Sequence, residues 1–323
     1  MQHISQQLIR IFADGQQHSA EQLAAHTGLQ LEAIPNEIQT LNQHYGLNIQ
    51  QSATNFRLDM PLNLLDKSTI LAYLSDTQRA VLQQCQLSLS TASTNTLALQ
   101  NPPDPHHAAV WLTEFQSAGR GRRGRQWVGG FARQLQCSLM YTFRLPTQQL
   151  SGLSIAVGAV LAERLNHYQV PDLSLKWPND IHCQGQKIAG ILLEVQGNTA
   201  GPVSAVIGIG LNLLPDASVE PQIKQPFTNL HSLGIQLDRN RLAGELIHDL
   251  INLCQAYPTT GLAPYLALWQ DYDHWQGQPV TLTGPQHQQQ GQYVGLDDEG
   301  HLLLQVGSNI QRYHAGELSL RRT

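Results

Sequence analysis

Between residues 83 and 275, strand-length apolar runs alternate with helix-length segments, and no other feature of the 323-residue chain constrains its fold as strongly. Such runs are typical of buried strands, and the helices between them cover the faces of a sheet. We therefore predict an α+β protein whose central mixed α/β domain is built on one sheet. Its strands are expected at 109–115, 135–143, 173–177, 188–195 and 203–212, and its helices at 153–167, 241–257 and 262–272.

The first sixty residues follow a helical period instead. Three apolar stripes at helical spacing end near Gly46, and the second opens with the capping-box pair Ser19 and Gln22. Two short strand candidates follow, at 47–50 and 55–58. Three helices and a two-stranded wing predict a winged helix-turn-helix domain. A small helical module that contacts another protein is the alternative.

The last fifty residues contain short apolar runs separated by turn residues such as Gly284 and Pro285. Short strands at this spacing predict a small SH3-like β-barrel. A connector with one helix, expected at 67–74, joins the first part to the central domain. The predicted domains are 1–62 for the winged helix-turn-helix, 63–275 for the central domain and 276–323 for the barrel.

Charge and apolar content exclude several classes of protein. The formal net charge of −5 excludes a globally basic coat that binds nucleic acid. The longest apolar run, 155–162, is too short to span a bilayer, and the polar N-terminus lacks a signal core. Four scattered cysteines without a Cys-x-x-Cys pair argue against a zinc ribbon or a disulfide framework. These features predict a soluble, cytoplasmic protein that does not contact a membrane.

One segment is far more basic than the rest of the chain. Four of the 19 Lys and Arg residues of the chain fall within 120–125, where they are interleaved with glycines. Glycine disfavours a stable helix, so the segment is expected to be a mobile cationic loop. Guanidinium groups bind phosphate bidentately, which favours an anion site. A solvated charge run, a nucleic-acid tether and a localisation signal are the alternatives.

Four further segments place polar or small residues beside predicted strands and helices. Residues 176–180 end a strand in a turn, 187–194 open one with a lysine, 208–212 end one with an amide, and 93–95 precede a helix. Taken singly, the alternatives are a turn, a solvated lysine and an N-cap. The dinucleotide fingerprint, the Walker lysine motif and the Gly-x-Ser-x-Gly elbow are absent, so ATP chemistry would need a different cradle.

Taken together, the order of these segments resembles that of the biotin protein ligases, the enzymes that attach biotin to carrier domains. The closing strand of that family is similar to residues 316–321, and the N-terminal part is similar to the bifunctional bacterial form that also represses the biotin operon. The segments that carry the resemblance are 93–95, Gln116 with 119–127, 176–180, 187–194 and 208–212.

The resemblance implies a two-step reaction that uses biotin, ATP and Mg²⁺. The biotin carboxylate attacks the α-phosphate of ATP to give biotinyl-5′-adenylate and pyrophosphate. A lysine of the acceptor, the biotin carboxyl carrier protein of acetyl-CoA carboxylase, then attacks the mixed anhydride. The first step brings two anions together, so cations are needed to stabilise the developing charge.

The family motifs also imply roles for individual residues. The residues implied in catalysis are Lys187, Arg120, Arg122, Arg123 and Asp180. Those implied in binding biotin are Ser93, Thr94, Asn95, Gln116, Arg120, Gly121, Arg122, Lys187 and Gly190. Those implied in binding ATP and adenine are Arg123, Arg125, Trp127, Lys176, Asn179, Asn212 and Phe227. The metal ligands are not assigned.

Three further expectations concern the adenine loop, Lys187 and the choice of substrate. The adenine loop of the family usually carries a tryptophan near its end, and Phe227 stands as the apolar ring of that segment here. Lys187 precedes an apolar strand at a polar, edge-like position, so replacing it should leave the fold intact. An arginine loop with a terminal barrel favours biotin over the alternative substrate, lipoate.

The N-terminal part carries the wrong charge for DNA. Residues 1–66 contain two basic and six acidic side chains, a net charge of −4 with His neutral. The candidate recognition helix holds Glu32 and Glu37, and Pro35 either interrupts it or delays its start. DNA binding is therefore doubtful, although a bifunctional ligase and repressor is the alternative. The sequence leaves the oligomeric state open, including a homodimer.

Overall fold

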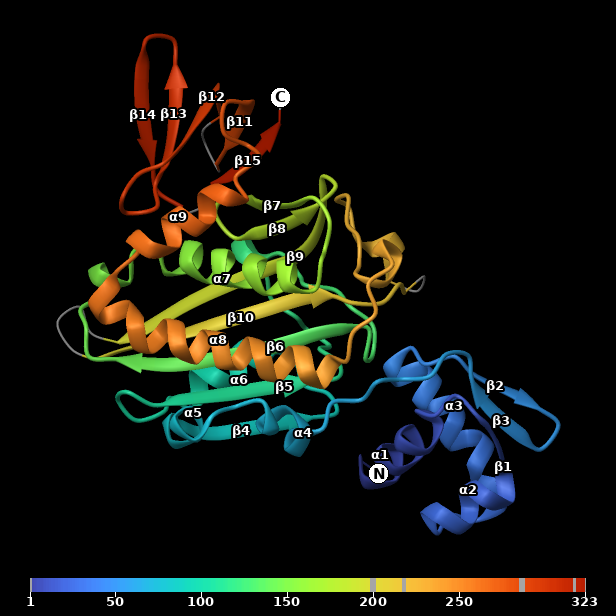
Figure 1. Cartoon of the computed structure of the whole chain (residues 1–323). Helices are drawn as coiled ribbons and strands as arrows, with labels where there is room; N and C mark the ends of the chain where they lie inside the picture. The colour runs from blue at the N-terminus through green and yellow to red at the C-terminus, as the bar shows by residue number, and fades with distance from the viewer. Residues whose placement is uncertain (1, 198–201, 217–218, 285–287, 316–317, 323) are drawn as a thin grey trace.

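A computed structural model gives the fold of residues 2–197, 202–216, 219–284, 288–315 and 318–322. A small N-terminal unit lies to one side of a large central sheet, and the C-terminal strands lie beyond the other end of that sheet (Figure 1). The protein is therefore a mixed α+β protein with one large sheet, as predicted. No helix within the described ranges is both long and apolar enough to cross a membrane.

The N-terminal unit has the three predicted helices and one strand more than predicted. Ser19 and Gln22 form the predicted capping box. Pro35 lies in the first turn of the third helix, where its missing N–H costs nothing, so this helix starts at Ile34 and not at Leu31. The helices and strands are α1 (Gln2–Phe12), β1 (Gln17–Ser19), α2 (Ala20–Thr27), α3 (Ile34–Tyr45), β2 (Ile49–Ser52) and β3 (Asn55–Leu58).

The central sheet has seven strands in the order β4-β5-β6-β10-β9-β8-β7. Every neighbouring pair is antiparallel except β4 and β5. The strands are β4 (Leu82–Ser88), β5 (Ala108–Thr113), β6 (Gln134–Phe143), β7 (Leu173–Lys176), β8 (Asp180–Cys183), β9 (Gln186–Gly197) and β10 (Val203–Asn212). The sequence prediction had no strand at β4 or β8, and it treated Asp180, the first residue of β8, as part of a turn.

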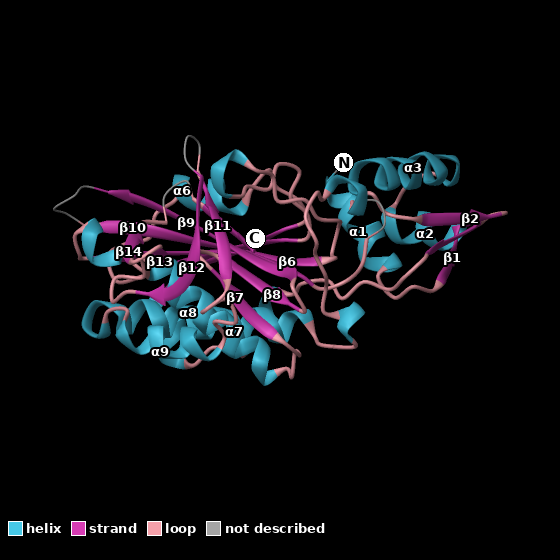
Figure 2. Cartoon of the chain, turned by 90° about the horizontal axis from the view of Figure 1, so that it is seen from above, coloured by secondary structure: helices cyan, strands magenta, loops and turns pink. Residues whose placement is uncertain are grey.

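Helices cover the two faces of this sheet unequally (Figure 2). Three long helices cover one face and bury an extensive apolar core, whereas α6 covers only part of the other face, against Trp111, Met140 and Val206. The site described below lies on the second face. The helices of this part are α4 (Lys67–Ala72), α5 (Asp76–Val81), α6 (Thr94–Gln100), α7 (Leu153–His167), α8 (Arg239–Thr260) and α9 (Ala263–Asp271).

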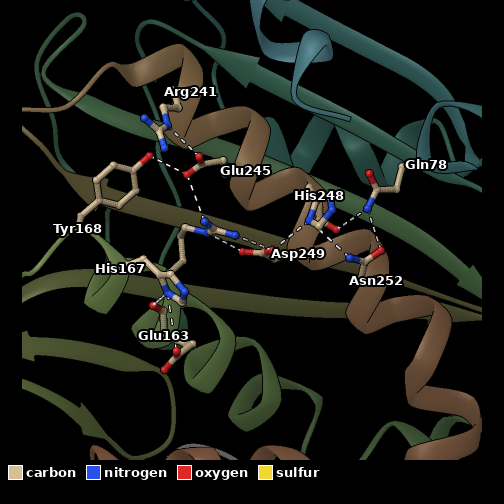
Figure 3. Close-up of polar contacts among 10 residues, drawn as sticks. Gln78, Glu163, His167, Tyr168, Arg241, Glu245, His248, Asp249 and Asn252 are labelled. Carbon is tan, nitrogen blue, oxygen red and sulfur yellow. Dashed lines mark hydrogen bonds and ion pairs between the residues drawn. The ribbon is translucent and has the colours of Figure 1, made fainter. Parts of the chain in front are cut away.

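A polar network on the outer side of the helical layer joins α7 to α8. Arg164 donates to both oxygens of Asp249, at 2.7 and 2.9 Å, and to Glu245 at 3.2 Å. Glu245 also accepts from the Tyr168 hydroxyl and from Arg241 (Figure 3). These half-buried pairs fix how the two helices lie against each other, and they are far from the polar face of the sheet.

The C-terminal strands form a five-stranded sheet in the order β14-β13-β12-β11-β15. No pairing joins β14 to β15 within the described residues, so closure of this sheet into a barrel stays a prediction. The Trp177 indole donates to the carbonyl of Gly300 at 3.1 Å and ties this sheet to the central one. The strands are β11 (Pro279–Thr283), β12 (Gln288–Leu296), β13 (Leu302–Val306), β14 (Asn309–Tyr313) and β15 (Ser319–Arg322).

A buried ion pair fixes the segment between the N-terminal unit and the central sheet. Arg239 and Glu114 are 2% and 5% exposed, and their side chains meet at 2.7 Å. Arg239 also donates to the carbonyls of Asn63 and Gln134, and Glu114 accepts from the backbone N–H of Leu65. The connecting chain is therefore bound to the central domain by charged groups that water does not reach.

Removing one partner of this pair should be strongly destabilising. We expect Arg239→Met to lower the free energy of unfolding by about 3–5 kcal/mol, because Glu114 would stay buried without its counter-charge. Glu114→Gln in the Arg239→Met background should restore part of the loss. Urea unfolding measures the free energy of unfolding of the single and the double variant. Arg241→Gln, which breaks a partly exposed pair, is the matched control, with an expected loss below about 1 kcal/mol. An Arg239→Met variant as stable as this control would contradict the prediction.

Candidate functional site

One row of residues crosses five strands of the sheet and forms the floor of the site. In the register of the sheet, Lys176 pairs with Asp180, Asp180 with Gly190, Gly190 with Gly210, and Gly210 with Gln136. Residues directly opposite each other in antiparallel strands point to the same face. The row therefore places two charged groups, two glycines and an amide side by side on the face that α6 leaves partly open.

The two glycines of this row make room for a large ring. A Cβ atom on Gly210 would lie 2.3 Å from the indole of Trp127, and one on Gly190 would lie 3.1 Å from it. The indole N–H donates to Gln134 at 2.9 Å, and Gln134 donates to the Asn212 side chain at 2.9 Å. Trp127 and Asn212, which the sequence analysis placed at the adenine, are thus joined through Gln134.

A buried ion pair lies beside the glycines. The ammonium group of Lys187 is 2.6 Å from a carboxylate oxygen of Asp180, and it lies 5.4 Å from the centre of the Trp127 ring. Burial acts to raise the pKa of Asp180, but the charges of Lys187 and Lys176 outweigh it, so the pKa stays below its usual value. Burial lowers the pKa of Lys176, and Asp180 offsets part of this effect.

Lys187 is therefore not at the edge-like position that the sequence suggested. It is 9% exposed, and the segment that contains Phe227 runs beside it, with a hydrogen bond from its backbone N–H to the carbonyl of Pro226. Replacing Lys187 alone would leave Asp180 buried without a partner. The expectation that the fold loses nothing is wrong for that reason.

Uncharged polar groups gather at the N-terminus of α6. Ser93 accepts a hydrogen bond from the backbone N–H of Thr96 and so caps the helix, which confirms the capping alternative for this residue. The Gln116 side chain accepts from the backbone N–H of Thr94 at 2.8 Å. The Ser138 hydroxyl lies 2.7 Å from that of Thr94 and 2.5 Å from the side-chain oxygen of Asn95.

The arginine loop contains one turn of 3₁₀ helix, at Arg122–Gly124, and no α-helix. Arg120 forms a bidentate pair with Glu194, at 2.7 and 3.0 Å. Arg122 donates to the Asn179 side chain at 3.0 Å and to the carbonyl of Ala315 at 2.7 Å. The loop thus contacts β9, the turn before β8 and the C-terminal part at once. Its predicted mobility stays a prediction.

Two adjoining cavities receive most of the residues that the sequence analysis selected. The first, of about 450 Å³, is lined by fourteen of them: Ser93, Thr94, Asn95, Gln116, Arg120, Gly121, Arg122, Arg125, Trp127, Asn179, Lys187, Gly190, Asn212 and Phe227. The second, of about 650 Å³, adds Lys176 and Asp180 and shares Arg122 and Arg125 with the first. Arg123 lines neither cavity.

Comparison with known proteins agrees with this arrangement. Residues 87–212 match the model of the biotin/lipoate A/B protein ligase family, and residues 277–321 match the biotin protein ligase C-terminal domain. The chain is 35% identical over 315 residues to the bifunctional ligase/repressor BirA of Escherichia coli (strain K12), covering 97% of this chain and 96% of that protein. The chain belongs to the biotin protein ligase family.

Two further relatives match a shorter part of the chain. The biotin–[acetyl-CoA-carboxylase] ligase of Paracoccus denitrificans is 32% identical over 244 residues, which are 71% of this chain and 97% of that protein. The solved structure of the biotin protein ligase of Aquifex aeolicus in complex with biotin and ATP has a TM-score of 0.63 and 24% identity, covering 75% of this chain and 100% of that one. The likeness to the Aquifex aeolicus structure supports the fold alone.

Several residues of this biotin protein ligase site had no role in the sequence analysis. Gln134 joins Trp127 to Asn212, Glu194 joins Arg120 to Asn95, and Arg321 lines both cavities. Gln134 could have been found, because a glutamine that opens a largely apolar strand needs a polar partner when it is buried. The partner of Glu194 is 74 residues away, and no local pattern indicates it.

The second cavity also contains a buried histidine with an unusual pKa. His182 is 7% exposed, and its Nε2 has no hydrogen-bond partner among the described residues. Burial, together with the charge of Lys176, lowers its pKa from 6.5 to about 4. The ring is therefore neutral at neutral pH, next to a cluster of cations.

This shift makes stability depend on pH. The pKa of His182 is lower in the folded chain, so its full contribution is present above pH 6.5 and is lost as the pH falls towards 4. Between pH 7 and pH 5 the wild type should lose about 2 kcal/mol more than His182→Gln. Urea unfolding followed by tryptophan fluorescence at the two pH values measures the difference. Equal losses in the two proteins would contradict the prediction.

Proposed function

We propose that the chain attaches biotin to a specific lysine of the biotin carboxyl carrier protein of acetyl-CoA carboxylase, with ATP, through biotinyl-5′-adenylate. One observation carries the proposal: a single cavity is lined by an uncharged polar cluster at one end and by cations at the other. The first matches a neutral cyclic urea, and the second matches a carboxylate and phosphates. The membership of the chain in the biotin protein ligase family supports the same reaction.

The polar end is proposed to hold the ureido ring of biotin. Thr94, Asn95, Gln116 and Ser138 offer both donors and acceptors within a buried space, as a urea requires. The dithiolane ring of lipoate has no N–H or C=O and would leave these groups unpaired, which costs binding energy. The site therefore favours biotin over lipoate. A thermal-shift comparison of the two acids, each with ATP, tests this choice.

The cationic end is proposed to bring the biotin carboxylate against the α-phosphate of ATP. Lys187 lines the first cavity, and Arg122, Arg125 and Arg321 line both cavities. They offset the repulsion between the two anions and stabilise the charge that develops during attack. Holding both reactants in one cavity also removes the entropic cost of bringing them together. The proton balance is simple, because the carboxylate attacks in its ionised form.

Adenine is proposed to bind near Trp127, Asn212 and Phe227, with Gln134 fixing the indole. Mg²⁺ is part of the MgATP substrate in this proposal. No group of three or more acidic, histidine or cysteine side chains among the described residues could hold a metal alone. Phosphate oxygens would therefore supply most ligands of the ion, as is common for Mg²⁺, and Asp180 is one of the two carboxylates that line the adjoining cavity.

The finer architecture and the compartment belong to the same proposal. The N-terminal helices with the β1-β3-β2 sheet support a winged helix-turn-helix over 1–62, and the five C-terminal strands support an SH3-like barrel over 276–323, which leaves 63–275 as the ligase domain. All four cysteines are buried and unpaired, which supports a reducing compartment, the cytoplasm.

The ammonium group of Lys187 should be essential for forming the adenylate. We expect Lys187→Met to lower biotin-dependent pyrophosphate release by about a hundredfold or more, because the reacting anions lose a positive charge within a dry site. Stability should fall as well, since Asp180 is left unpaired. The double variant Lys187→Met/Asp180→Asn separates the two effects and should be stable but inactive. Release within about threefold of wild type, roughly 0.7 kcal/mol of barrier, would remove Lys187 from the mechanism.

The N-terminal unit should not bind DNA specifically. Its two basic side chains are Arg10 and Arg57, and Arg57 donates to the carbonyl of Gly15. On α3, the exposed positions Asn36, Gln39 and Gln43 are uncharged, so the helix offers no lysine or arginine to neutralise phosphate.

A mobility-shift assay tests this prediction. It uses the promoter of the organism's own biotin genes, with biotin and ATP present, at about 0.1 M salt. The expected result is no specific complex, with an unrelated DNA of equal length as the control. A promoter-specific complex at nanomolar protein that needs both ligands would establish the repressor alternative.

A further inference from the structure

One carboxylate joins two parts of the biotin end that come from distant regions of the chain. Glu194 accepts two hydrogen bonds from the Arg120 guanidinium and one from the Asn95 side chain, at 2.9 Å. Arg120 belongs to the arginine loop, and Asn95 belongs to α6. Both line the first cavity, whereas Glu194 does not. The carboxylate therefore acts on the cavity only through these two residues.

We propose that Glu194 is a positioning residue for biotin, which holds the arginine loop closed and sets the orientation of the Asn95 amide. The inference rests on the proposed function, because it assigns biotin to this end of the cavity. The Asn95 nitrogen donates to Glu194 and to the carbonyl of Leu192, so the amide oxygen faces the Ser138 hydroxyl. If the Asn95 amide were flipped, its N–H₂ group would face the Ser138 hydroxyl. Its oxygen would then face the Glu194 carboxylate, and two acceptors would lie against each other.

The strand register explains why Glu194 can reach both partners. Leu192 lies opposite Gly208, and Glu194 lies opposite Val206, so all four point to the face that α6 covers. A Cβ atom on Gly208 would lie 2.1 Å from the Asn95 side-chain oxygen. The missing side chain at this position lets Asn95 reach down to the sheet, where Glu194 meets it.

Glu194 can also be replaced without disturbing the apolar core. The described pairing of β8 with β9 ends at Gly190, so beyond it β9 pairs with β10 alone. The Glu194 side chain is 21% exposed, and that of Arg120 is 44% exposed. The loop has a second attachment, through Arg122 to Asn179 and Ala315. Losing Glu194 therefore frees the Arg120 end of the loop while the Arg122 contacts remain.

Three variants test the proposal in the full-length protein. Glu194→Ala removes both contacts. Glu194→Gln keeps an oxygen that accepts from Asn95 but loses the charge that holds Arg120. Arg241→Gln is the matched control, because it also breaks one partly exposed arginine–glutamate pair, on the far side of the sheet. Two assays are used: pyrophosphate release, which gives the kcat and the KM for biotin, and trypsin cleavage within 120–125 without any ligand, which gives a rate.

We expect Glu194→Ala to raise the KM for biotin about tenfold with little change in kcat, because the lost interaction serves binding and not the chemical step. Trypsin cleavage of the loop should rise about five- to tenfold, as for loss of a bidentate ion pair. Glu194→Gln should recover most of the KM and keep the fast cleavage. The control should match the wild type in both measurements.

The alternative outcomes are distinct. A wild-type KM together with wild-type cleavage in Glu194→Ala would overturn the proposal. An equal fall of kcat in the Ala and Gln variants would also overturn it, since it would place the charge of Glu194 in the chemical step. If the wild type itself releases no pyrophosphate with biotin, the proposed function fails, and the cleavage rates still report whether Glu194 holds the loop.

Discussion

The pairing of Gly190 with Gly210 across β9 and β10 is the constraint on which the site depends. A side chain at Gly210 would occupy the space where Trp127 lies, and one at Gly190 would crowd both Trp127 and Lys187. The same row places Asp180 on one flank and Gln136 on the other, and Lys187 meets Asp180 there. A flat, side-chain-free patch in the middle of a sheet thus decides where a large planar ring and two buried charges can come together.

The sequence predicted the elements better than the contacts between them. The helix at Leu153–His167 and the strand at Val203–Asn212 are confirmed to the residue, because each is a long, nearly continuous apolar run. The three-residue strand β1 is too short to show a period, and β4 and β8 were not found because polar residues interrupt their apolar positions. The sequence left open whether Pro35 interrupts the third helix or delays its start. The structure places Pro35 in the first turn of α3, where proline is tolerated.

At the site, most residues that the sequence motifs indicated line the two adjoining cavities. Residues that act by holding another side chain in place were not predicted. Lys187 was described as an edge residue because a lysine before an apolar strand is usually solvated, and only the position of Asp180 across the strand pair explains its burial. Gln134 and Glu194 hold other site residues at a distance in sequence. Tertiary pairing of this kind depends on sheet register, which a single sequence does not encode locally.

The N-terminal unit is packed into the ligase domain more closely than a tethered module would be. Phe131 and Ala132, which follow Trp127 by a few residues, belong to the apolar core of the N-terminal unit, and the Tyr45 and Phe131 rings lie 5.2 Å apart. Together with the Arg239–Glu114 pair, this contact gives the unit a structural role that does not require DNA. Its acidic surface is compatible with such a role.

The contact between Arg122 and the carbonyl of Ala315 spans 193 residues. With Arg321, it makes the last part of the chain a wall of the cavities. A chain cut between the central sheet and these strands would keep the glycine pair and the arginine loop but would lack one side of both cavities.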